Sequence, residues 1–498
     1  MTALCLGGLL VSLDGTILGT AVPAITAEFG SLGDVGWYNS VYLLTMSVPQ
    51  LLFGKLNSRY PVRWNHSAAM LLFVVGSAVC GAAPSSAGLI AGRAIAGLGC
   101  SGLLVSTMSL APVLAPPARQ PLLIGMFAAT MGLGIAIGPL VGGVLTETVS
   151  WRWNFYINLP FAAVIYAVFL WLVPSPSNPI ARTTTPTHSS FWQTLDPLGL
   201  TTLTASVTSL LLALQWGGVQ YPWNDARITA LLVLSGVLSL VFLCVEVWQR
   251  ENAMLPASIF TQRSVVCSAL FSFCSSGASV VLVYYLPSWF QGVMGVNALQ
   301  SGVNTLPLVM TTVFTTAAGG LLLTHVGQVG TLMLVATVFM SIGAGLFTTF
   351  KFDSPTSYWI GCQIVYGLGN GFSRQAPAIA VQKVLAESDM PIGFGMIMFS
   401  QFMGGAIFIP IAQAIFINKL AGGLQSLGLH AVDPATLAAE GLTTITAGLE
   451  GQVKDAALTV INNSLVQAWH VSVGLACAGI IGVVFVEHGR INRKPKNL

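Results

Sequence analysis

Long runs of apolar residues alternate with short polar segments along almost the whole chain. Most runs hold about 20 residues, the length at which an α-helix crosses the hydrocarbon core of a bilayer. Gly, Pro, Asn and charged residues separate fourteen such runs, and we expect helices at 4–24, 37–56, 65–83, 87–108, 121–145, 154–173, 198–216, 227–248, 265–289, 300–323, 329–350, 358–380, 395–420 and 466–486. The pattern predicts an all-α polytopic membrane protein.

The spacing of these runs groups them as six, two and six. We predict an N-terminal six-helix bundle in residues 1–173 and a C-terminal six-helix bundle in residues 264–498. Between them, residues 174–263 hold two extra helices, preceded by the Pro-, Ser- and Thr-rich segment 174–197, whose composition indicates a flexible linker. A longer loop is expected on the outer side at 421–463, and parts of it could be helical. A short C-terminal tail completes the chain.

A short internal repeat supports two related bundles. Gly97-Leu98-Gly99 in the fourth expected helix recurs as Gly367-Leu368-Gly369 in the fourth helix of the second bundle. The same offset places Gln363 opposite Arg93, so the charged residue occurs in the first bundle alone. Two related six-helix halves with a substrate path between them are an expected transporter architecture.

Composition and charge placement agree with a membrane protein. Charged residues make up 7% of the chain, against about 25% in typical soluble domains. With the N-terminus inside, twelve of the 19 Lys and Arg residues fall on the inner side and five on the outer side, which predicts that both termini are cytoplasmic. All eight cysteines lie in apolar runs, so packing roles are expected rather than disulfides.

Two charged residues lie inside expected membrane helices of the first bundle, Asp14 and Arg93. A charge at that depth costs roughly 2.5–3.5 kcal/mol on insertion scales, and residues of this kind commonly serve proton relays or substrate paths. A carboxyl group balanced between burial and a nearby Arg can load and release a proton. The alternative is a buried ion pair that only fixes helix packing.

Other polar and glycine positions are weaker candidates. Gly134, Gly138, Gly142 and Gly143 form a small-residue face around Pro139, which favours close packing of a helix that bends. Six residues could line a substrate cavity, with purely structural contacts as the alternative: Tyr42, Tyr284, Tyr285, Gln291, Gln363 and Arg374. Asn462 begins a candidate N-glycosylation sequon.

Several function classes find no support in the sequence. A phosphate-binding GxxxxGK[ST] loop is missing, no inner segment is long enough for an ATPase domain, and no His and Cys cluster has metal-ligand spacing. We therefore expect neither an enzyme nor a nucleic-acid partner, no metal and no cofactor. A loop rich in basic residues, from Gly54 to Trp64, is by composition a positive-inside loop.

Motifs spread over most of the chain resemble the major facilitator superfamily, and specifically its fourteen-span drug:proton antiporters. The matching segments are Leu13 to Ile17, Arg93 to Gly102, Gly134 to Gly143, Trp151 to Pro160, and Tyr284 to Pro287. The amino-acid sequence as a whole is most similar to those of fungal mycotoxin efflux pumps of the aflatoxin and HC-toxin type. The resemblance implies a role of Arg93 in proton transfer and makes the glycine face of residues 134–143 the antiporter signature.

The resemblance also implies that the loop after the second helix is a cytoplasmic gate, with Gly54, Lys55, Arg59 and Arg63 as its residues. The chain departs from the family pattern here, because Ser58 stands where the family has an acidic residue and Pro61 where it has a glycine. The ion pair that locks this gate in other members is therefore expected to be absent or replaced.

These observations predict a proton-coupled antiporter that exports amphipathic small molecules by alternating access. Its partners would be the substrate, protons and the lipid bilayer; we expect a monomer in the plasma membrane, or alternatively in a vacuolar or vesicle membrane. Two alternatives remain. One is an importer or vacuolar permease of the same fold, for basic amino acids or iron chelates. The other is a receptor or scaffold, which would not need Asp14 and Arg93 inside its membrane helices.

Overall fold

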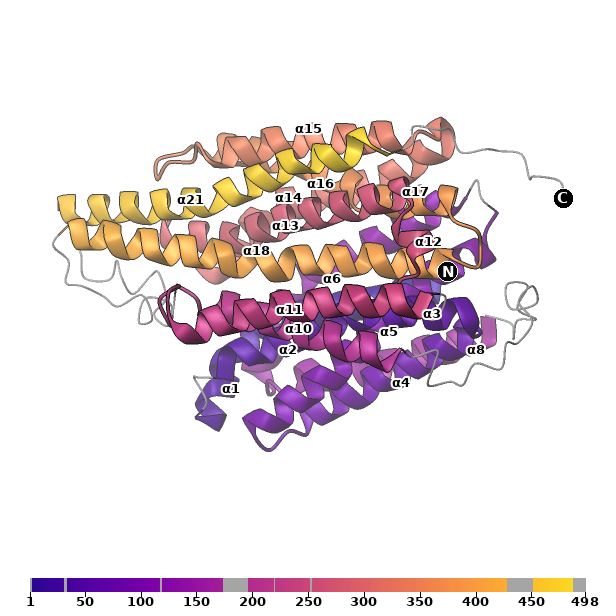
Figure 1. Ribbon diagram of the computed structural model, residues 1–498. Helices are drawn as coiled ribbons and strands as arrows, with labels where there is room; N and C mark the ends of the chain where they lie inside the picture. Colours follow the sequence, from indigo (N-terminus) through magenta and orange to yellow (C-terminus); the bar gives the residue numbers. More distant parts are fainter. Residues whose placement is uncertain are drawn as a thin grey trace.

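The computed structural model describes almost all of the expected helices, and every element in its described part is a helix, with no strand. The helices run roughly parallel to one another in an elongated bundle (Figure 1). Most of the predicted linker and the C-terminal tail lie outside the described residues, which are 2–30, 34–116, 119–172, 196–218, 220–250, 253–427 and 451–486.

The first six predicted membrane helices correspond to eight elements. The second helix is broken where Pro49 removes a backbone donor, and a short helix at Trp153–Tyr156 precedes the sixth. The bounds are α1 (Thr2–Phe29), α2 (Val35–Ser47), α3 (Pro49–Arg59), α4 (Val62–Gly81), α5 (Ser86–Leu114), α6 (Gln120–Thr148), α7 (Trp153–Tyr156) and α8 (Asn158–Leu172).

The rest of the chain supplies the two extra helices and the second bundle. The bounds are α10 (Pro197–Trp216), α11 (Ala226–Gln249), α12 (Ala257–Phe260), α13 (Arg263–Gly292), α14 (Ala298–Val326), α15 (Val329–Phe347), α16 (Thr356–Ser373), α17 (Ala376–Val384), α18 (Met390–Ser426) and α21 (Gly451–Val484). Twelve helices of the described residues are long and apolar enough to cross a membrane. The two other predicted spans, 37–56 and 358–380, are α2 with α3 and α16 with α17, so the arrangement fits fourteen crossings.

Parts of the segment predicted as an outer loop, 421–463, are helical, a possibility that the sequence left open. Residues 421–426 continue α18, and α21 begins at Gly451 rather than near residue 466. These ends are polar enough to lie in water, so apolarity alone could not reveal that they are helical. At 37 and 34 residues, α18 and α21 extend beyond the other helices at one end of the bundle (Figure 1).

The repeated glycines have equivalent neighbours in the two bundles. A Cβ atom added to Gly97 of α5 would lie 2.6 Å from the Tyr42 carbonyl oxygen of α2. A Cβ atom on Gly367 of α16 would lie 3.1 Å from the Leu308 carbonyl oxygen of α14. The fourth helix of each bundle therefore lies against the second one at a distance that a larger residue would not allow.

The second glycine of each repeat faces the third helix of its bundle. A Cβ atom on Gly99 would lie 2.7 Å from the Ala69 carbonyl oxygen of α4, and one on Gly369 would lie 2.7 Å from the Ala336 carbonyl oxygen of α15. The internal repeat in the sequence thus corresponds to repeated packing in three dimensions.

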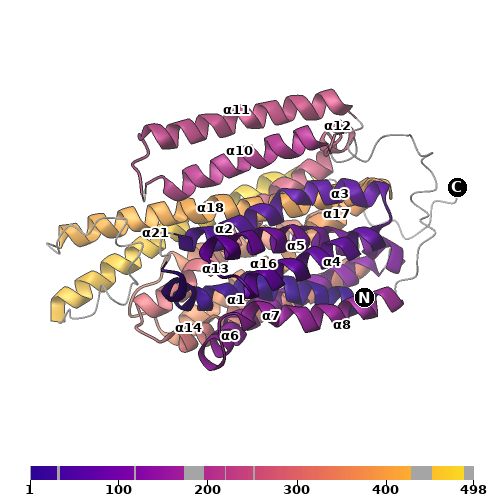
Figure 2. The same cartoon turned by 90° about the horizontal axis from the view of Figure 1, so that it is seen from below.

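The two bundles meet along two seams, α3 with α18 and α6 with α14. The extra helices α10 and α11 form an outer layer beside α18, α2 and α3 (Figure 2). α11 is the most exposed of the apolar helices, with only 11% of its span covered by protein, as expected for a helix that faces lipid. We call the end of the bundle that holds residues 54–63 the gate end; α1 begins there and α21 ends there (Figure 1).

We predict that Gly99→Val destabilises the first bundle. The added side chain would overlap the backbone of α4, and overpacking of this kind typically costs about 1–3 kcal/mol in the free energy of unfolding. Thermal unfolding of the purified protein in detergent measures the change. Gly361→Val is the control, since a Cβ atom there meets nothing within 4 Å; equal stability of the two variants would contradict the packing described here.

Candidate functional site

Asp14 and Arg93 form an ion pair inside the first bundle. Nη1 of Arg93 lies 2.8 Å from Oδ2 of Asp14, and both side chains are fully buried. Asp14 comes from the middle of α1 and Arg93 from α5, so the pair links two helices. Their contact could not be predicted from the sequence because 79 positions separate them.

Asn158 is a third member of this site, although it was not among the site residues predicted from the sequence. Its Nδ2 donates a hydrogen bond of 2.9 Å to Oδ1 of Asp14 and another of 3.3 Å to Oγ of Ser77 on α4. Each carboxylate oxygen of Asp14 therefore accepts from one side chain. The signal in the sequence that could have identified it was its place within the Trp151 to Pro160 motif, where an amide side chain stands at the start of α8.

Two tyrosines of α2 complete the surroundings of Arg93. Its Nε donates to the Tyr38 carbonyl oxygen at 3.2 Å, and its guanidinium carbon lies 3.7 Å from the centre of the Tyr42 ring. The Tyr42 hydroxyl lies 3.0 Å from the Cys100 sulfur. Nη2 of Arg93 has no hydrogen-bond partner among the described atoms. Tyr42 thus packs on the ion pair, while its predicted contact with substrate stays a prediction.

The glycine face of α6 packs directly against α1. A Cβ atom on Gly134 would lie 2.7 Å from the Leu9 carbonyl oxygen, and one on Gly142 would lie 2.7 Å from that of Ile17. Gly138, midway between them, approaches Thr16 just as closely. The helix that carries Asp14 is therefore held against α6 by backbone contact over two turns.

Two residues of the predicted antiporter motif do not belong to this face. Pro139 is exposed on the other side of α6, and a Cβ atom on Gly143 would meet nothing within 4 Å. Proline in a helix interior removes one backbone hydrogen bond and bends the helix, so Pro139 can act on α6 without touching α1.

Gly54 lies where α3 meets α18 at the gate end. A Cβ atom on Gly54 would be 2.8 Å from the Pro391 carbonyl oxygen, and one on Gly395 would be 2.5 Å from the Gln50 carbonyl oxygen. The second seam is equally close, because a Cβ atom on Gly320 of α14 would lie 2.8 Å from a backbone oxygen of α6. In this structure the two bundles are therefore in backbone contact at the gate end.

The three basic residues of the gate loop occupy different places. Lys55 is 1% exposed on α3, and Arg59 is half-buried at the last position of that helix. Arg63 belongs to α4, and its Nη2 donates to the Leu170 carbonyl oxygen of α8 at 3.0 Å. Arg63 therefore stabilises the first bundle, whereas Lys55 lies beside the seam.

An exposed ion pair connects α1 to the Trp151 motif at the opposite end. Nη1 of Arg152 lies 2.8 Å from Oε1 of Glu28, and the Trp151 indole donates to Oε2 of Glu28 at 2.6 Å. The hydrogen bonds from Trp151 and then Arg152 lower the pKa of Glu28. Nη2 of Arg152 also donates to the Ala83 carbonyl oxygen, so this motif joins the ends of three helices.

Gln363, the counterpart of Arg93, contacts the backbone of α14. Its Oε1 accepts from the Leu308 N–H at 3.2 Å, and its Nε2 donates to the Asn304 carbonyl oxygen at 2.9 Å. Pro307 lies between these two groups inside α14, and a proline in a helix interior disturbs the backbone hydrogen bonds around it. The side-chain amide thus satisfies both backbone groups, and a contact with substrate stays a prediction.

The other cavity candidates differ in exposure. Tyr284 is 52% exposed and Tyr285 is 3% exposed, and their rings meet edge to face with 5.1 Å between centroids. Gln291 donates a hydrogen bond of 3.4 Å to Ser301, and Arg374 is half-buried at the break between α16 and α17. Their roles in substrate binding stay predictions.

Asn462 lies inside α21 and contacts two other elements. Its Nδ2 donates to the Phe350 carbonyl oxygen at 2.9 Å, and its Oδ1 accepts from the Trp289 indole at 2.8 Å. The side chain is 4% exposed. Attachment of a glycan needs an accessible amide nitrogen, so this placement does not favour the predicted modification.

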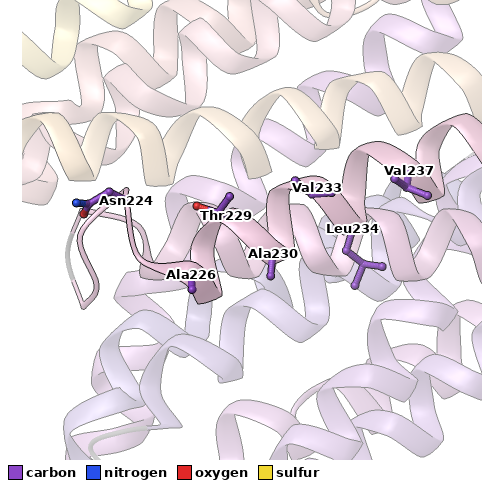
Figure 3. A pocket seen from close by; sticks show the side chains of 7 residues that line it. All are labelled: Asn224, Ala226, Thr229, Ala230, Val233, Leu234 and Val237. Carbon is purple, nitrogen blue, oxygen red and sulfur yellow. The ribbon is translucent and has the colours of Figure 1, made fainter.

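A shallow hollow of about 640 Å³ lies along α11, away from the charged pair (Figure 3). Its walls are almost entirely aliphatic and belong to the exposed outer layer, which suits lipid chains rather than a specific ligand. The lining residues are Asn224, Ala226, Thr229, Ala230, Val233, Leu234 and Val237. Among the residues that the structure places, no group of three or more His, Cys, Asp or Glu side chains could hold a metal ion.

The family model of the Major Facilitator Superfamily matches residues 4–409. The chain belongs to this superfamily. It is therefore an integral membrane transporter and not an enzyme. A solved member of the superfamily, the proton:xylose symporter XylE, superposes with a TM-score of 0.61 at 13% identity, covering 97% of this chain and 94% of that one, which shows a shared fold.

Two fungal proteins are much more similar in sequence. The efflux pump roqT of Penicillium rubens is 42% identical over 99% of this chain and 91% of its own length. The efflux pump aflT of Aspergillus parasiticus is 40% identical over 96% of this chain and 92% of its own length. The resemblance to fungal toxin efflux pumps, expected from the motifs, is confirmed.

We predict that Gln363→Leu destabilises the second bundle. The Leu308 N–H and the Asn304 carbonyl would both lose their partner in an apolar environment, and an unsatisfied buried group costs about 1–3 kcal/mol. Thermal unfolding in detergent measures the loss. A Gln363→Leu protein as stable as wild type would show that this amide does not stabilise the backbone of α14 around Pro307.

Proposed function

We propose that the chain is a proton-coupled antiporter that exports amphipathic small molecules, namely a secondary metabolite, a toxin or drugs of a fungal cell. The observation that carries the proposal is the buried Asp14–Arg93 pair with Asn158 on its second carboxylate oxygen. A buried ion pair stabilises a fold poorly against its desolvation cost. Proton binding by Asp14 would explain why the chain contains this buried pair, whereas helix packing alone would not.

The direction of transport is supported by the relatives that are named efflux pumps, at 40% identity and above over nearly the whole chain. In the proposed cycle, a proton from the outer side neutralises Asp14 and frees Arg93, which favours substrate release. Return of the proton to the inner side restores the pair and the substrate site. The proton gradient drives the cycle, and no nucleotide or other cofactor takes part.

The proposed transporter works as a monomer in the plasma membrane with both termini in the cytoplasm. With that orientation, the gate end faces the cytoplasm, and the close seams at Gly54 and Gly320 shut the transport path on that side. This state would be the one that releases substrate outward. Opening requires the two bundles to separate along both seams, which is the rocking motion of alternating access.

We expect Asp14→Asn to abolish coupling while the protein still folds, because asparagine keeps the shape but binds no proton at that site. The measurement is accumulation of fluorescent amphiphiles in efflux-deficient yeast, with and without a protonophore. Wild type should lower accumulation only without protonophore, and Asp14→Asn should not lower it at all.

The control is Glu147→Gln, which removes an exposed carboxylate of α6 and should export like wild type. Equal export by Asp14→Asn and wild type under the same gradient would contradict the proposed coupling. Increased accumulation by wild type would instead identify an importer of the same fold.

A further inference from the structure

Two carboxyl groups lie together outside both six-helix bundles, where α10 begins and α11 ends. Asp196 is the N-cap residue of α10, and Glu246 is in the last turn of α11. Asp196 is fully buried and Glu246 is 6% exposed. Neither residue belongs to the transport site described above, and acidic residues are almost never buried to this degree without a partner.

The two carboxyl groups differ in the donors around them. Asp196 accepts hydrogen bonds from the Gly199 N–H at 2.9 Å, from Nε2 of Gln249 at 2.5 Å and from the Met254 N–H at 3.3 Å. The positive end of the α10 dipole adds to these. Asp196 is therefore surrounded by groups that stabilise a negative charge.

Glu246 has much weaker support for a charge. Its Oε2 accepts from the Leu255 N–H at 2.8 Å, but its Oε1 has no hydrogen-bond partner among the described atoms. It also lies at the negative end of the α11 dipole. An ionised Glu246 would leave one buried carboxylate oxygen without a donor.

The unpartnered oxygen of Glu246 lies near the Asp196 carboxyl group. A Cβ atom on Gly199 would lie 2.8 Å from Cγ of Asp196 and 2.9 Å from Oε1 of Glu246, so glycine leaves open the space that the two groups share. Two ionised carboxylates can only accept hydrogen bonds and repel each other. Carboxyl groups that share such a site hold one proton between them.

We propose that Asp196 and Glu246 form a second proton-binding site, in which Oε1 of Glu246 carries the proton and donates it in a hydrogen bond to the Asp196 carboxylate. The hydrogen bonds of Asp196 to the turn around Met254 explain how α10 and α11 are joined, but they do not explain a buried Glu246. The proton accounts for both its burial and its unpartnered oxygen.

The pair also faces the gate. Among the residues that the structure describes, the charged groups within electrostatic range of Glu246 are Asp196 and Lys55, and those within range of Lys55 are Arg59, Asp196 and Glu246. One apolar cluster joins α10 and α11 to α3 and α18 at the seam; it includes Leu52, Leu203, Phe242, Met254, Ile392 and Met396. The outer layer in Figure 2 thus lies against the helices that close the gate end.

The charge of the pair therefore acts on Lys55. With the proton absent, two carboxylates hold the Lys55 ammonium beside the closed seam, in place of the acidic residue that the gate loop lacks at Ser58. Proton uptake leaves one negative charge and weakens this hold, which favours separation of α3 from α18. This regulatory role depends on the proposed alternating-access transport, whereas proton binding by the pair does not.

Infrared difference spectroscopy of the purified protein in lipid vesicles tests proton binding without transport. We expect a carboxylic acid C=O band that disappears as the pH is raised through neutrality. The band should be missing in Glu246→Gln and present in Glu387→Gln, which removes an exposed carboxylate. An identical band in wild type and Glu246→Gln would overturn the proposal.

A second variant covers the case in which Glu246→Gln does not fold. Asp196→Asn removes the neighbouring negative charge, so the band of Glu246 should disappear at lower pH than in wild type. Asparagine also tolerates the left-handed backbone of position 196, where φ is 44°. An unchanged titration in Asp196→Asn would show that the two carboxyl groups do not share a proton.

The proposed effect of the carboxyl pair on Lys55 is tested separately, by the titration of the same band in a Lys55 variant. Lys55→Gln removes the cation that faces the pair, so the band should persist to a pH higher by about half a unit or more. An unchanged titration in Lys55→Gln would reject the link to the gate. A normal band in Asp14→Asn, with or without transport, keeps this test independent of the coupling proposed for Asp14.

Discussion

The buried contact between Asp14 and Arg93 draws polar groups from most helices of the first bundle. Two full charges lie where neither water nor lipid headgroups reach them, so every nearby polar group must come from the protein. Side chains and carbonyls from α1, α2, α4, α5 and α8 therefore converge on one point. Such convergence is possible only where helices approach closely, which the glycines of α5 and α6 allow.

The second bundle has the same packing without the charge. Gly367 and Gly369 repeat the contacts of Gly97 and Gly99, but Gln363 takes the place of Arg93. Its neutral amide bonds the backbone groups on either side of Pro307 and needs no counter-ion. The duplicated architecture thus separates two tasks, since the first bundle holds an ion pair and the second holds a neutral amide that supports the backbone of α14.

The extra helices α10 and α11 add a third part with a different environment. They pack as an outer layer against α3 and α18, so they lie beside one of the two seams between the bundles. Low dielectric at that place strengthens each electrostatic interaction between Lys55 and the carboxyl groups of the layer. The proposed proton on this pair would therefore change the electrostatic environment of Lys55 on α3.

The sequence by itself determined the helices and the membrane class, because apolar runs of about 20 residues admit few other structures. It also identified Asp14, Arg93 and the glycine face of α6, since charges and glycines stand out in an apolar helix. Only the tertiary structure decided that Asn158 completes the site, that Gln363 serves the backbone of α14, and that Glu246 lies against Asp196. These contacts join helices far apart in the chain, and their geometry depends on packing that no local pattern encodes.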